Sequence, residues 1–358
     1  MDLAMDYQPT TMAVMSKWTA QVMGCHSGAL DYSAGSHAMP SVAVQTFTDP
    51  CEYETFTCDA QHRVVIAGRG SYQARTVRMD LQRILMRRAW QSLPSVSHLA
   101  IPTGRSAVCF PLDADQISAM WRGREVLPGE MFVVHSGGDF HNRTDEGGQW
   151  ASVSMASETL DTYMRDVAGS DLKLADVTHV RSSGAAMARL LAVHQAAAGL
   201  AETAPDILLR PEVAKAFEGK VMAAVVDCLA GAVMLERHRS TRQPIMRRFE
   251  ELLEADQDRI LHIPDVCSAI GVSERTLRHR CIEHLGMSPY RYLQLRRMHQ
   301  VRRALSIADA KAKTVTEIAT DYGYWELGRF SVAYKRLFGE SPSTTLGRET
   351  GSNAAAPR

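Results

Sequence analysis

Apolar residues follow two different periods along this chain. Between about 41 and 156 they form short runs or alternate with polar residues, and Gly, Pro and Asp separate the runs. Alternation with a period of two is typical of strands with one buried face. The runs are RVVIAG, SYQARTVRM, QRILMRR, SHLAIP, SAVCFPL, QISAMWRGREVL, MFVVHS and WASVSM. This pattern predicts an antiparallel β-sandwich or small barrel.

From about 158 the pattern changes to that of helices. The segments ETLDTYMRDVAG, AAMARLLAVHQAAAGLA and PEVAKAFEGKVMAAVVDCLAGAVMLERH predict three helices, so the fold class is α+β. Their wide apolar faces must pack against the β-rich region or a second chain, and we expect a homodimer. The most apolar stretch, 221–235, contains Asp227 and is too short to cross a bilayer. We expect a buried helix there and no membrane partner.

The C-terminal part contains two copies of one pattern. DVCSAIGVSERTLRHRCIEHLGMSP begins at Asp265, and EIATDYGYWELGRFSVAYKRLFGESP begins at Glu317. Each runs from an acidic residue through a Gly to an amphipathic segment that ends in Gly-x-Ser-Pro. A helix, a Gly-containing turn and a second helix form a helix-turn-helix, whose second helix fits the major groove of DNA. Internal similarity of this kind indicates a tandem repeat.

In the first copy we expect a recognition helix from Glu274 to His284, capped by Ser273. Its apolar positions repeat every four residues and must face the core. The residues expected to contact bases are Arg275, Thr276, Arg278 and His279. An arginine there can donate two hydrogen bonds to one guanine. On an isolated helix the same residues would be an ordinary solvated face.

In the second copy, Thr314 and Glu317 have the spacing of a capping box, which predicts a support helix from about Val315. The outer residues expected to face the groove are Leu327, Gly328, Arg329, Ser331 and Val332. With one cation, this face is poorly equipped for hydrogen-bond readout. The residues expected to contact the DNA backbone are Ser273, Thr314, Thr316 and Lys335.

The segment between the copies predicts one long helix that begins near Pro289, with Tyr292, Leu295 and Leu305 on its buried side. About twenty residues span roughly 30 Å, close to one turn of DNA at about 34 Å, so the two recognition helices could reach successive major-groove segments. The arginines on this helix are Arg291, Arg296, Arg297, Arg302 and Arg303. They can serve as phosphate contacts or as partners of nearby acids.

The tandem units, and above all GYWELGRFSVAYKRLFGESPS, resemble the DNA-binding domain of AraC/XylS-type transcription regulators. The resemblance covers about the last hundred residues. It implies a transcription regulator, usually an activator that works with RNA polymerase on double-stranded promoter DNA. It also implies an N-terminal cupin-like domain that senses a small-molecule effector or dimerises.

Charge and cysteine content agree with a DNA-binding C-terminal part. Residues 259–348 contain 15 Lys and Arg against 8 Asp and Glu, whereas residues 1–258 contain 24 against 31. A basic segment that coincides with the repeat suits phosphate binding. The seven cysteines are scattered without a CxxC pair, which favours a reduced, cytoplasmic protein. Cys267 and Cys281 are expected in the core.

A competing site lies in MFVVHSGGDFHNRT, where His135, Asp139 and His141 are close in sequence. Such side chains could bind a metal in a β-barrel, but the spacing departs from that of metal-binding cupins, and polar residues in a β-turn are the ordinary explanation. We expect no metal, cofactor or catalytic residue, and no enzyme. The alternatives are a metal-dependent, ligand-processing enzyme fused to a DNA-binding domain, or a constitutive dimeric DNA-binding protein without an effector.

These patterns predict five regions along the chain. A poorly structured segment (1–40) precedes a sensing and dimerisation domain (41–236), which is β-rich over 41–156 and helical over 157–236. A basic, polar linker (237–244) leads to a double helix-turn-helix domain (245–346). A flexible tail (347–358) ends the chain.

Overall fold

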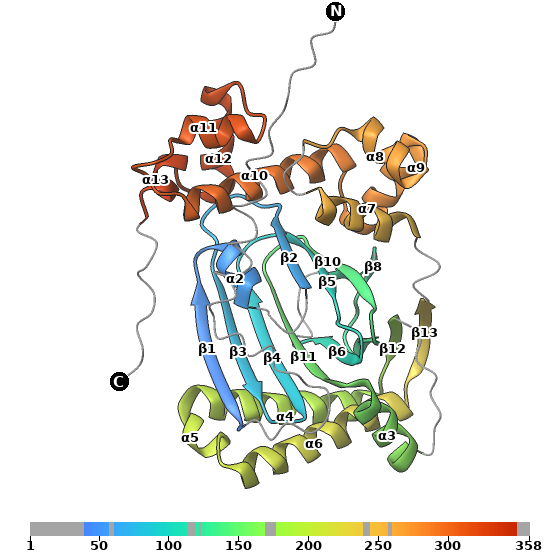
Figure 1. The fold of residues 1–358 in the computed structure, drawn as a ribbon. Coiled ribbons are helices and arrows are strands. Elements are labelled where there is room, and N and C mark those ends of the chain that lie inside the picture. The colour runs from blue at the N-terminus through green and yellow to red at the C-terminus, as the bar shows by residue number, and fades with distance from the viewer. Residues whose placement is uncertain are drawn as a thin grey trace, which may run out of the picture. The chain divides into compact units, whose positions relative to one another are not determined.

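Two antiparallel sheets form the N-terminal part of the protein (Figure 1). The computed structural model describes residues 39–56, 61–112, 119–121, 123–168, 177–238, 244–256 and 260–348. Among these, the larger sheet has eight strands in the order β1 (Ser41–Phe47), β3 (Ala74–Asp80), β4 (Ile84–Gln91), β11 (Gly148–Ala156), β6 (Arg105–Pro111), β9 (Glu130–Val134), β12 (Val177–Arg181) and β13 (Val233–His238). The smaller sheet has five described strands in the order β2 (Gln61–Ile66), β5 (Ser95–Ala100), β10 (Asp139–Thr144), β7 (Ala119–Trp121) and β8 (Arg124–Glu125).

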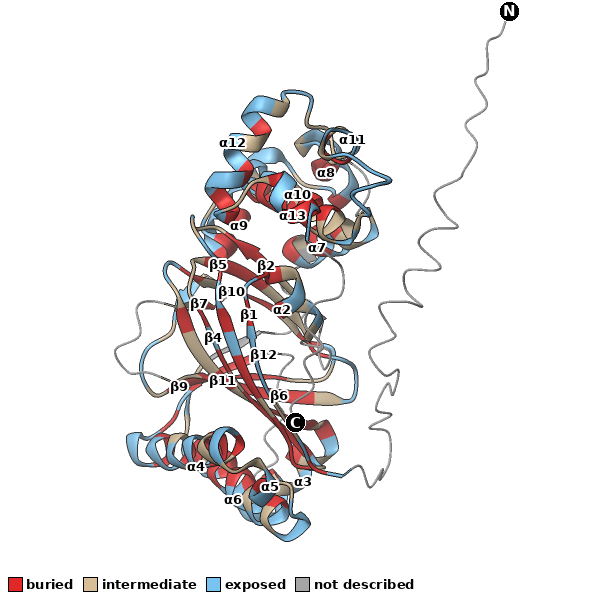
Figure 2. Ribbon diagram, turned by 90° about the vertical axis from the view of Figure 1, so that its left-hand side faces the viewer, coloured by how far each residue is buried: buried red, intermediate tan, exposed pale blue. Residues whose placement is uncertain are grey.

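The alternating pattern of the strands places two separate cores on the two faces of the larger sheet. On β6, Val108 and Phe110 face one core, whereas Ala107 and Cys109 face the other. The first core contains the apolar sides of α3 (Ser157–Ala168), α4 (Gly184–Thr203) and α6 (Pro211–Ala230). Figure 2 shows the strands of this sheet largely buried and the outer sides of α4 and α6 exposed. The expected packing of these helices on the β-rich region is therefore confirmed.

The second core lies between the two sheets. Phe132 of β9 stacks on Trp121 of β7 at a ring-centroid distance of 4.1 Å, and Phe140 of β10 stacks on the same indole at 4.9 Å. Near the other end, Phe47, Val64 and neighbouring residues pack together beside the short helix α2 (Pro50–Phe56). The predicted two-sheet β-rich region is confirmed.

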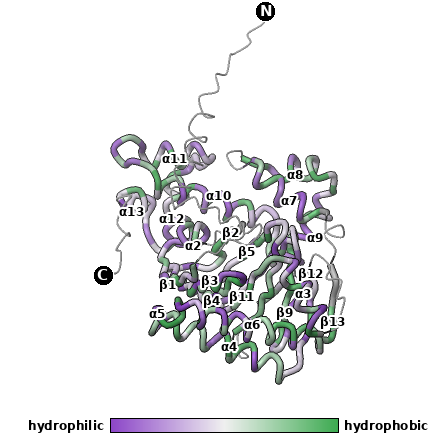
Figure 3. Tube along the Cα trace, turned by 60° about the horizontal axis from the view of Figure 1, so that its bottom comes forward, coloured by the Kyte–Doolittle hydropathy of each residue, from purple (hydrophilic) through white to green (hydrophobic). Residues whose placement is uncertain are grey.

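The helices of the C-terminal part are α7 (Pro244–Ala255), α8 (Ile263–Ile270), α9 (Glu274–Leu285), α10 (Pro289–Ile307), α11 (Val315–Asp321), α12 (Leu327–Phe338) and α13 (Pro342–Leu346). The short helix α5 (Pro205–Leu208) joins α4 to α6, and its Leu208 belongs to the first core. Helices α7 to α13 share one core, which also contains Val65 of β2 and Val96 of β5. Figure 3 shows hydrophobic and hydrophilic segments alternating along these helices, as expected for amphipathic elements.

Two elements differ from the sequence-based expectation. The predicted third helix ends at Ala230, and Val233–His238 forms β13, which pairs with β12 at the edge of the larger sheet. Gly231 caps the helix, and the β-branched and long side chains that follow extend the sheet instead. The region expected to be purely helical therefore contributes two strands. Residues 237 and 238 of the expected linker belong to β13, and 239–243 lie outside the described residues.

Strand β10 is the other difference. Its sequence, DFHNRT, is polar and was interpreted as a turn, yet it pairs with β5 over its whole length. Phe140, Asn142 and Thr144 are buried on one side, and His141 is buried on the other. Both faces of this strand are covered, so its buried polar groups depend on partners from distant segments.

The described residues between 39 and 348 belong to one compact unit, and the C-terminal helices contact the β-rich region directly. The expected segment 1–40 lies outside the described residues up to Ala38, and the expected tail does so from residue 349. In the described part of the chain, no helix is long and apolar enough to cross a membrane.

Candidate nucleic-acid interface

The first helix-turn-helix unit consists of α8, a tight turn and α9. Gly271 ends α8 in the left-handed conformation at φ 70°, where a side chain would be strained. Ser273 then caps α9, because its hydroxyl accepts a hydrogen bond from the Thr276 N–H at 3.2 Å. The predicted start of α9 at Glu274 and the predicted cap are confirmed, and the helix ends at Leu285, one residue later than expected.

The two sides of α9 have different surroundings. Leu277, Cys281 and Leu285 are completely buried in the core of the C-terminal helices, as expected. Of the four residues expected to contact bases, Arg275, Arg278 and His279 are exposed, whereas Thr276 is partly buried. The Thr276 hydroxyl lies 2.9 Å from the Ser273 hydroxyl. The exposed side can therefore meet a ligand without disturbing the core.

The second unit consists of α11, a turn and α12. Thr314 and Glu317 form the predicted capping box, in which each side chain binds the backbone N–H of the other residue. Phe330 and Tyr334 of α12 are buried, and the Tyr334 hydroxyl bonds to Thr345 of α13 at 2.8 Å. The unit is thus held together by aromatic packing and by α13.

The outer face of α12 carries the five residues expected to face the groove. Arg329 is 86% exposed and forms an ion pair with Glu326 at 2.7 Å. Val332 is 69% exposed, and Gly328 is exposed as well. Ser331 is partly buried, and Leu327 packs partly against the core, so it is less available than expected. This face offers one cation and one apolar side chain.

The four residues expected to contact the DNA backbone are all exposed, but they differ in whether their polar groups already act as helix caps. Thr316 and Lys335 are exposed. Ser273 and Thr314 are exposed too, but their hydroxyl groups already serve as helix caps. A capping hydroxyl has spare hydrogen-bonding capacity, so it can still meet a phosphate from outside.

The arginines of α10 divide into two groups. Arg296 and Arg302 are buried and ion-paired, Arg296 with Glu250 at 3.3 Å and Arg302 with Asp49 at 2.8 Å. Arg303 pairs with Glu54 of α2. Arg291 is exposed and Arg297 is partly buried. Sequence reasoning left both roles open for these arginines, and the structure gives the structural role to the first group.

A buried ionic network joins α7 and α10, which pack beside the first unit, to the smaller sheet, and sequence analysis missed it. Glu250 of α7 accepts hydrogen bonds from the His141 ring at 2.9 Å, the Tyr292 hydroxyl at 3.1 Å and the Arg296 guanidinium at 3.3 Å. The imidazole of His98 stacks on that of His141 at a centroid distance of 4.8 Å. The alternation of Phe140, His141 and Asn142 is a signal for a strand, but not for the contact with Glu250.

Charges in this network shift the pKa values of its members. Burial opposes ionisation of Glu250, but the hydrogen bond from His141 and the nearby His98 and Arg296 hold the pKa of this carboxyl well below its usual range. Burial lowers the pKa of His141. Burial has the same tendency at His98, yet the bond to Asp139 and the charge of Glu250 raise its pKa. The network therefore contains an ionised carboxylate at neutral pH.

The three residues of the competing metal site each contact a different partner. The His135 ring bonds to the Ser106 hydroxyl at 2.7 Å, Asp139 lies 3.3 Å from His98, and His141 binds Glu250. Within the described residues, no three His, Cys, Asp or Glu side chains are placed to hold one metal ion. His135 lies in a turn between β9 and β10, where its C=O accepts a hydrogen bond from the Gly138 N–H at 2.8 Å, as expected. Asp139 and His141 belong to β10 instead.

Comparison with known sequences gives matches in the C-terminal part. Residues 266–348 match the family described as "Helix-turn-helix domain", and the match includes both units. The chain is 30% identical over 136 residues to a XylDLEGF operon transcriptional activator of Pseudomonas putida, covering 38% of this chain and 42% of that one. It is 39% identical over 102 residues to a probable thc operon regulatory protein of Rhodococcus erythropolis, covering 28% and 31%. The chain thus matches less than half the length of these relatives.

Solved structures with similarity include the AraC-like transcriptional activator CuxR, at 18% identity, 78% coverage of this chain, 100% of that chain and a TM-score of 0.37. ToxT from Vibrio cholerae is similar at 12% identity, 86% and 98% coverage and a TM-score of 0.30. Scores this low support no argument about ligands or partners. The sequence matches confirm the resemblance of the C-terminal part to AraC/XylS-type regulators.

Proposed function

We propose that this chain, whose residues 266–348 belong to the helix-turn-helix family, is a sequence-specific transcription regulator that binds double-stranded promoter DNA. The observation that carries the proposal is the difference in burial between the two sides of α9. Its inner side is completely buried, and its outer side presents Arg275, Arg278 and His279 to solvent. Arginine and histidine donors on an exposed recognition helix can read base edges in the major groove.

Activation of transcription, with RNA polymerase as partner, is the regulatory outcome we propose. The support is the name of the relatives, since the similar proteins of Pseudomonas putida are transcriptional activators. The exposed part of α11 and α12 away from the DNA-facing residues leaves room for a protein contact. Transcription from a bound promoter, measured in vitro with and without the chain, would rise if this is correct and fall if the chain is a repressor.

The β-rich region is proposed to sense a small-molecule effector. The support is its direct contact with the DNA-binding helices through Glu250 and Arg302, which gives any change in the sheets a route to both units. A ligand acts on DNA affinity only when it binds the two states unequally. Transcription from a target promoter in the presence of candidate metabolites tests this; a constitutive regulator would respond to none of them.

Sequence-specific binding is tested with sheared DNA from the source organism and the purified chain at about 0.15 M salt. We expect a small set of fragments to be enriched, with affinity that falls steeply as salt rises, because bound phosphates release counterions. Uniform recovery of all fragments would contradict the proposal. A fragment from Gln243 to Arg358 is also expected to be helical and to bind the enriched DNA. In this fragment Arg302 loses Asp49, whereas Arg296 keeps Glu250.

Self-association through the helices between 185 and 236 is a further proposal. Most large apolar side chains of α4 and α6 pack against the larger sheet, including Leu190, Val221 and Met222. Their exposed sides carry mainly small and charged residues, so an interface there would be modest. Sedimentation of the full chain at micromolar concentration, with and without target DNA, distinguishes a dimer from a monomer.

An enzymatic role is the competing function, and no observed contact favours it. His135, Asp139 and His141 each have a different partner. Metal analysis of the purified chain separates the two functions. A stoichiometric transition metal that is lost on substitution of His135 and His141 would favour an enzyme.

A further inference from the structure

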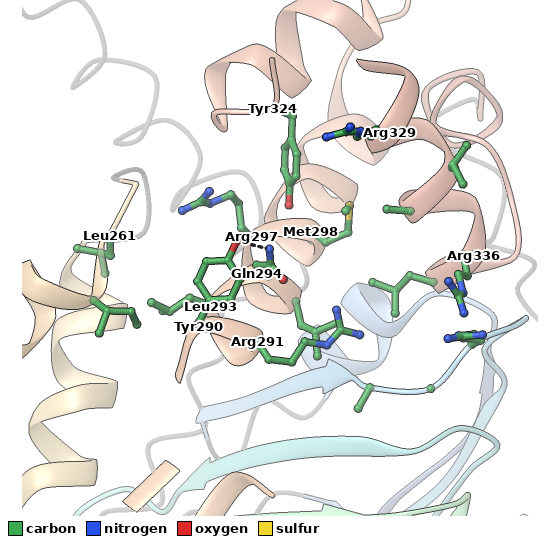
Figure 4. A pocket seen from close by; sticks show the side chains of 18 of the residues that line it. Leu261, Tyr290, Arg291, Leu293, Gln294, Arg297, Met298, Tyr324, Arg329 and Arg336 are labelled. Atoms are coloured by element: carbon green, nitrogen blue, oxygen red, sulfur yellow. Dashed lines mark hydrogen bonds between the residues drawn. The ribbon is translucent and has the colours of Figure 1, made fainter. Parts of the chain in front are cut away.

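A basic groove with a volume of about 1030 Å³ lies between α10, α12 and the loop that follows β2 (Figure 4). Among the described residues, its lining contains five arginines and His262, and no Asp or Glu. The arginines are Arg69, Arg291, Arg297, Arg329 and Arg336. We propose that this groove holds the phosphate backbone of bound DNA, and that the β-rich region itself contacts DNA through Arg69. The inference rests on the proposed function and extends the DNA surface beyond the two recognition helices.

The loop that carries Arg69 is fixed against the C-terminal helices. The N–H of Ile66 donates a hydrogen bond to the ring of His299 on α10 at 2.9 Å. Gly339, at the end of α12, is so close to Gly70 and Ser71 that an added Cβ would lie 3.1 Å from the Ser71 hydroxyl. A side chain on a fixed loop loses less freedom on binding than one on a mobile loop. Arg69 is thus held beside α12 before DNA arrives.

The groove arginines differ from the other arginines of α10 in their partners. Arg296, Arg302 and Arg303 point to carboxylates and form ion pairs. Within the described residues, the structure shows no ion pair for the side chains of Arg69, Arg291, Arg297 and Arg336. Arg329 is the groove arginine that pairs with an acid, Glu326. Cations gathered in one groove without such a pair repel each other and attract an anion. An extended polyanion satisfies all of them at once.

The position of the groove favours DNA over a small anionic ligand. One wall is the outer face of α12, including Gly328 and Val332, which we expect in the major groove. A duplex that receives α12 must carry its flanking phosphates past α10. Tyr290, 63% exposed on the rim, can pack on a sugar or donate to a phosphate.

The test measures the salt dependence of DNA binding by the full chain. The probe is a duplex selected by the wild-type chain from a random library, together with a scrambled duplex of the same length. Loss of one phosphate contact lowers the slope of log K against log salt by about 1. Arg69→Ala and Arg297→Ala should each do so, and should weaken binding to both duplexes about fivefold to tenfold near 0.1 M salt. Arg69→Lys should keep the slope.

The matched control is Arg210→Ala, an exposed arginine that precedes α6 in the β-rich region, and it should leave slope and affinity unchanged. Thermal unfolding checks that each variant is folded. An unchanged slope for Arg69→Ala and Arg297→Ala would overturn the inference, as would weaker binding without a change of slope. Neither result affects the proposed function, which fails separately if the wild-type chain selects no sequence from the library.

Discussion

The two helix-turn-helix units share a fold but present different chemistry to solvent. The outer side of α9 carries Arg275, Arg278 and His279, all hydrogen-bond donors. The outer side of α12 carries Val332 and Arg329, whose guanidinium is partly engaged by Glu326. The repeat keeps the apolar character of the buried positions and changes the exposed ones. The buried positions determine the fold of each unit, and the exposed positions determine which bases each unit can contact.

The units also differ in how they are held to the β-rich region. The first packs on α7, which is anchored through Glu250, whose carboxylate binds one residue from β10 and two from α10. The second is anchored through Arg302, which binds Asp49 at 2.8 Å and Glu340 at 2.9 Å. Both anchors are buried ion pairs, so removing one partner leaves an uncompensated charge. The anchors can therefore be broken one at a time.

The largest expected effect follows from breaking the first anchor. Glu250→Ala leaves His141 and Arg296 buried without their shared acceptor, and should lower the free energy of unfolding by about 3 to 5 kcal/mol. Urea denaturation at pH 7 measures it. The control is Glu251→Ala, whose exposed side chain pairs only with Arg247, and whose effect should stay within about 0.5 kcal/mol.

The same anchor predicts a pH dependence. The pKa of Glu250 is lowered on folding, so the carboxylate stabilises the folded chain above about pH 4.5 and this contribution is lost as the pH falls through the folded pKa. The difference in stability between the wild-type chain and Glu250→Gln should therefore be largest near pH 7 and shrink in acid. A difference that grows below pH 4.5 would contradict the assignment of an ionised Glu250.

A second effect separates base readout from phosphate contact. Arg278→Ala should relax the base preference in one half of the site by about 1 to 3 kcal/mol, because a bidentate contact to guanine is lost. Lys335→Ala should weaken binding to all sequences alike. Binding of each variant to a randomised library measures both. If Arg278→Ala lowers affinity uniformly instead, α9 is only a phosphate anchor.

The helix caps give a smaller difference between the units. Ser273→Ala removes the side-chain cap of α9 and should cost about 1 kcal/mol of stability. Glu326→Ala changes the N-cap residue of α12, which makes no side-chain cap bond, and should cost less than about 0.5 kcal/mol. Thermal unfolding of both variants compares them. Equal losses of stability in the two variants would show that the side-chain cap of Ser273 does not stabilise the start of α9.

The smallest effect is expected at the apolar position of α12. Val332→Ala removes two methyl groups that can contact a thymine methyl, and should reduce a thymine preference by about 1 kcal/mol or less. Binding of the variant to the randomised library measures this preference, which should change only at the base pairs that α12 contacts. A change of preference under α9 would show that Val332 acts through the fold rather than through a base.

Sequence analysis predicted those parts of the fold that depend on local signals. Ser273 and Thr314 act over a few residues, and the two helix starts that they define are predicted correctly. The spacing of Leu277, Cys281 and Leu285 was sufficient to identify the inner side of α9.

Features that depend on distant partners were missed. The partner of the buried His141 is Glu250, which lies 109 positions later in the chain. Nothing near His141 in the sequence signals that contact. Strand β13 continues an apolar helix without a Pro, and its strand character follows from pairing with β12. The buried role of Arg302 likewise depends on Asp49. Such residues look like exposed polar positions until the tertiary contacts are known.

The base preferences of the wild-type chain, measured position by position on a library randomised over about 25 base pairs, test the central claim most directly. The claim is that two unequal recognition helices read successive major-groove segments. We predict two blocks of preference centred about ten base pairs apart, with the stronger one under α9. A single block, two blocks of equal strength, or no preference at any position would contradict it.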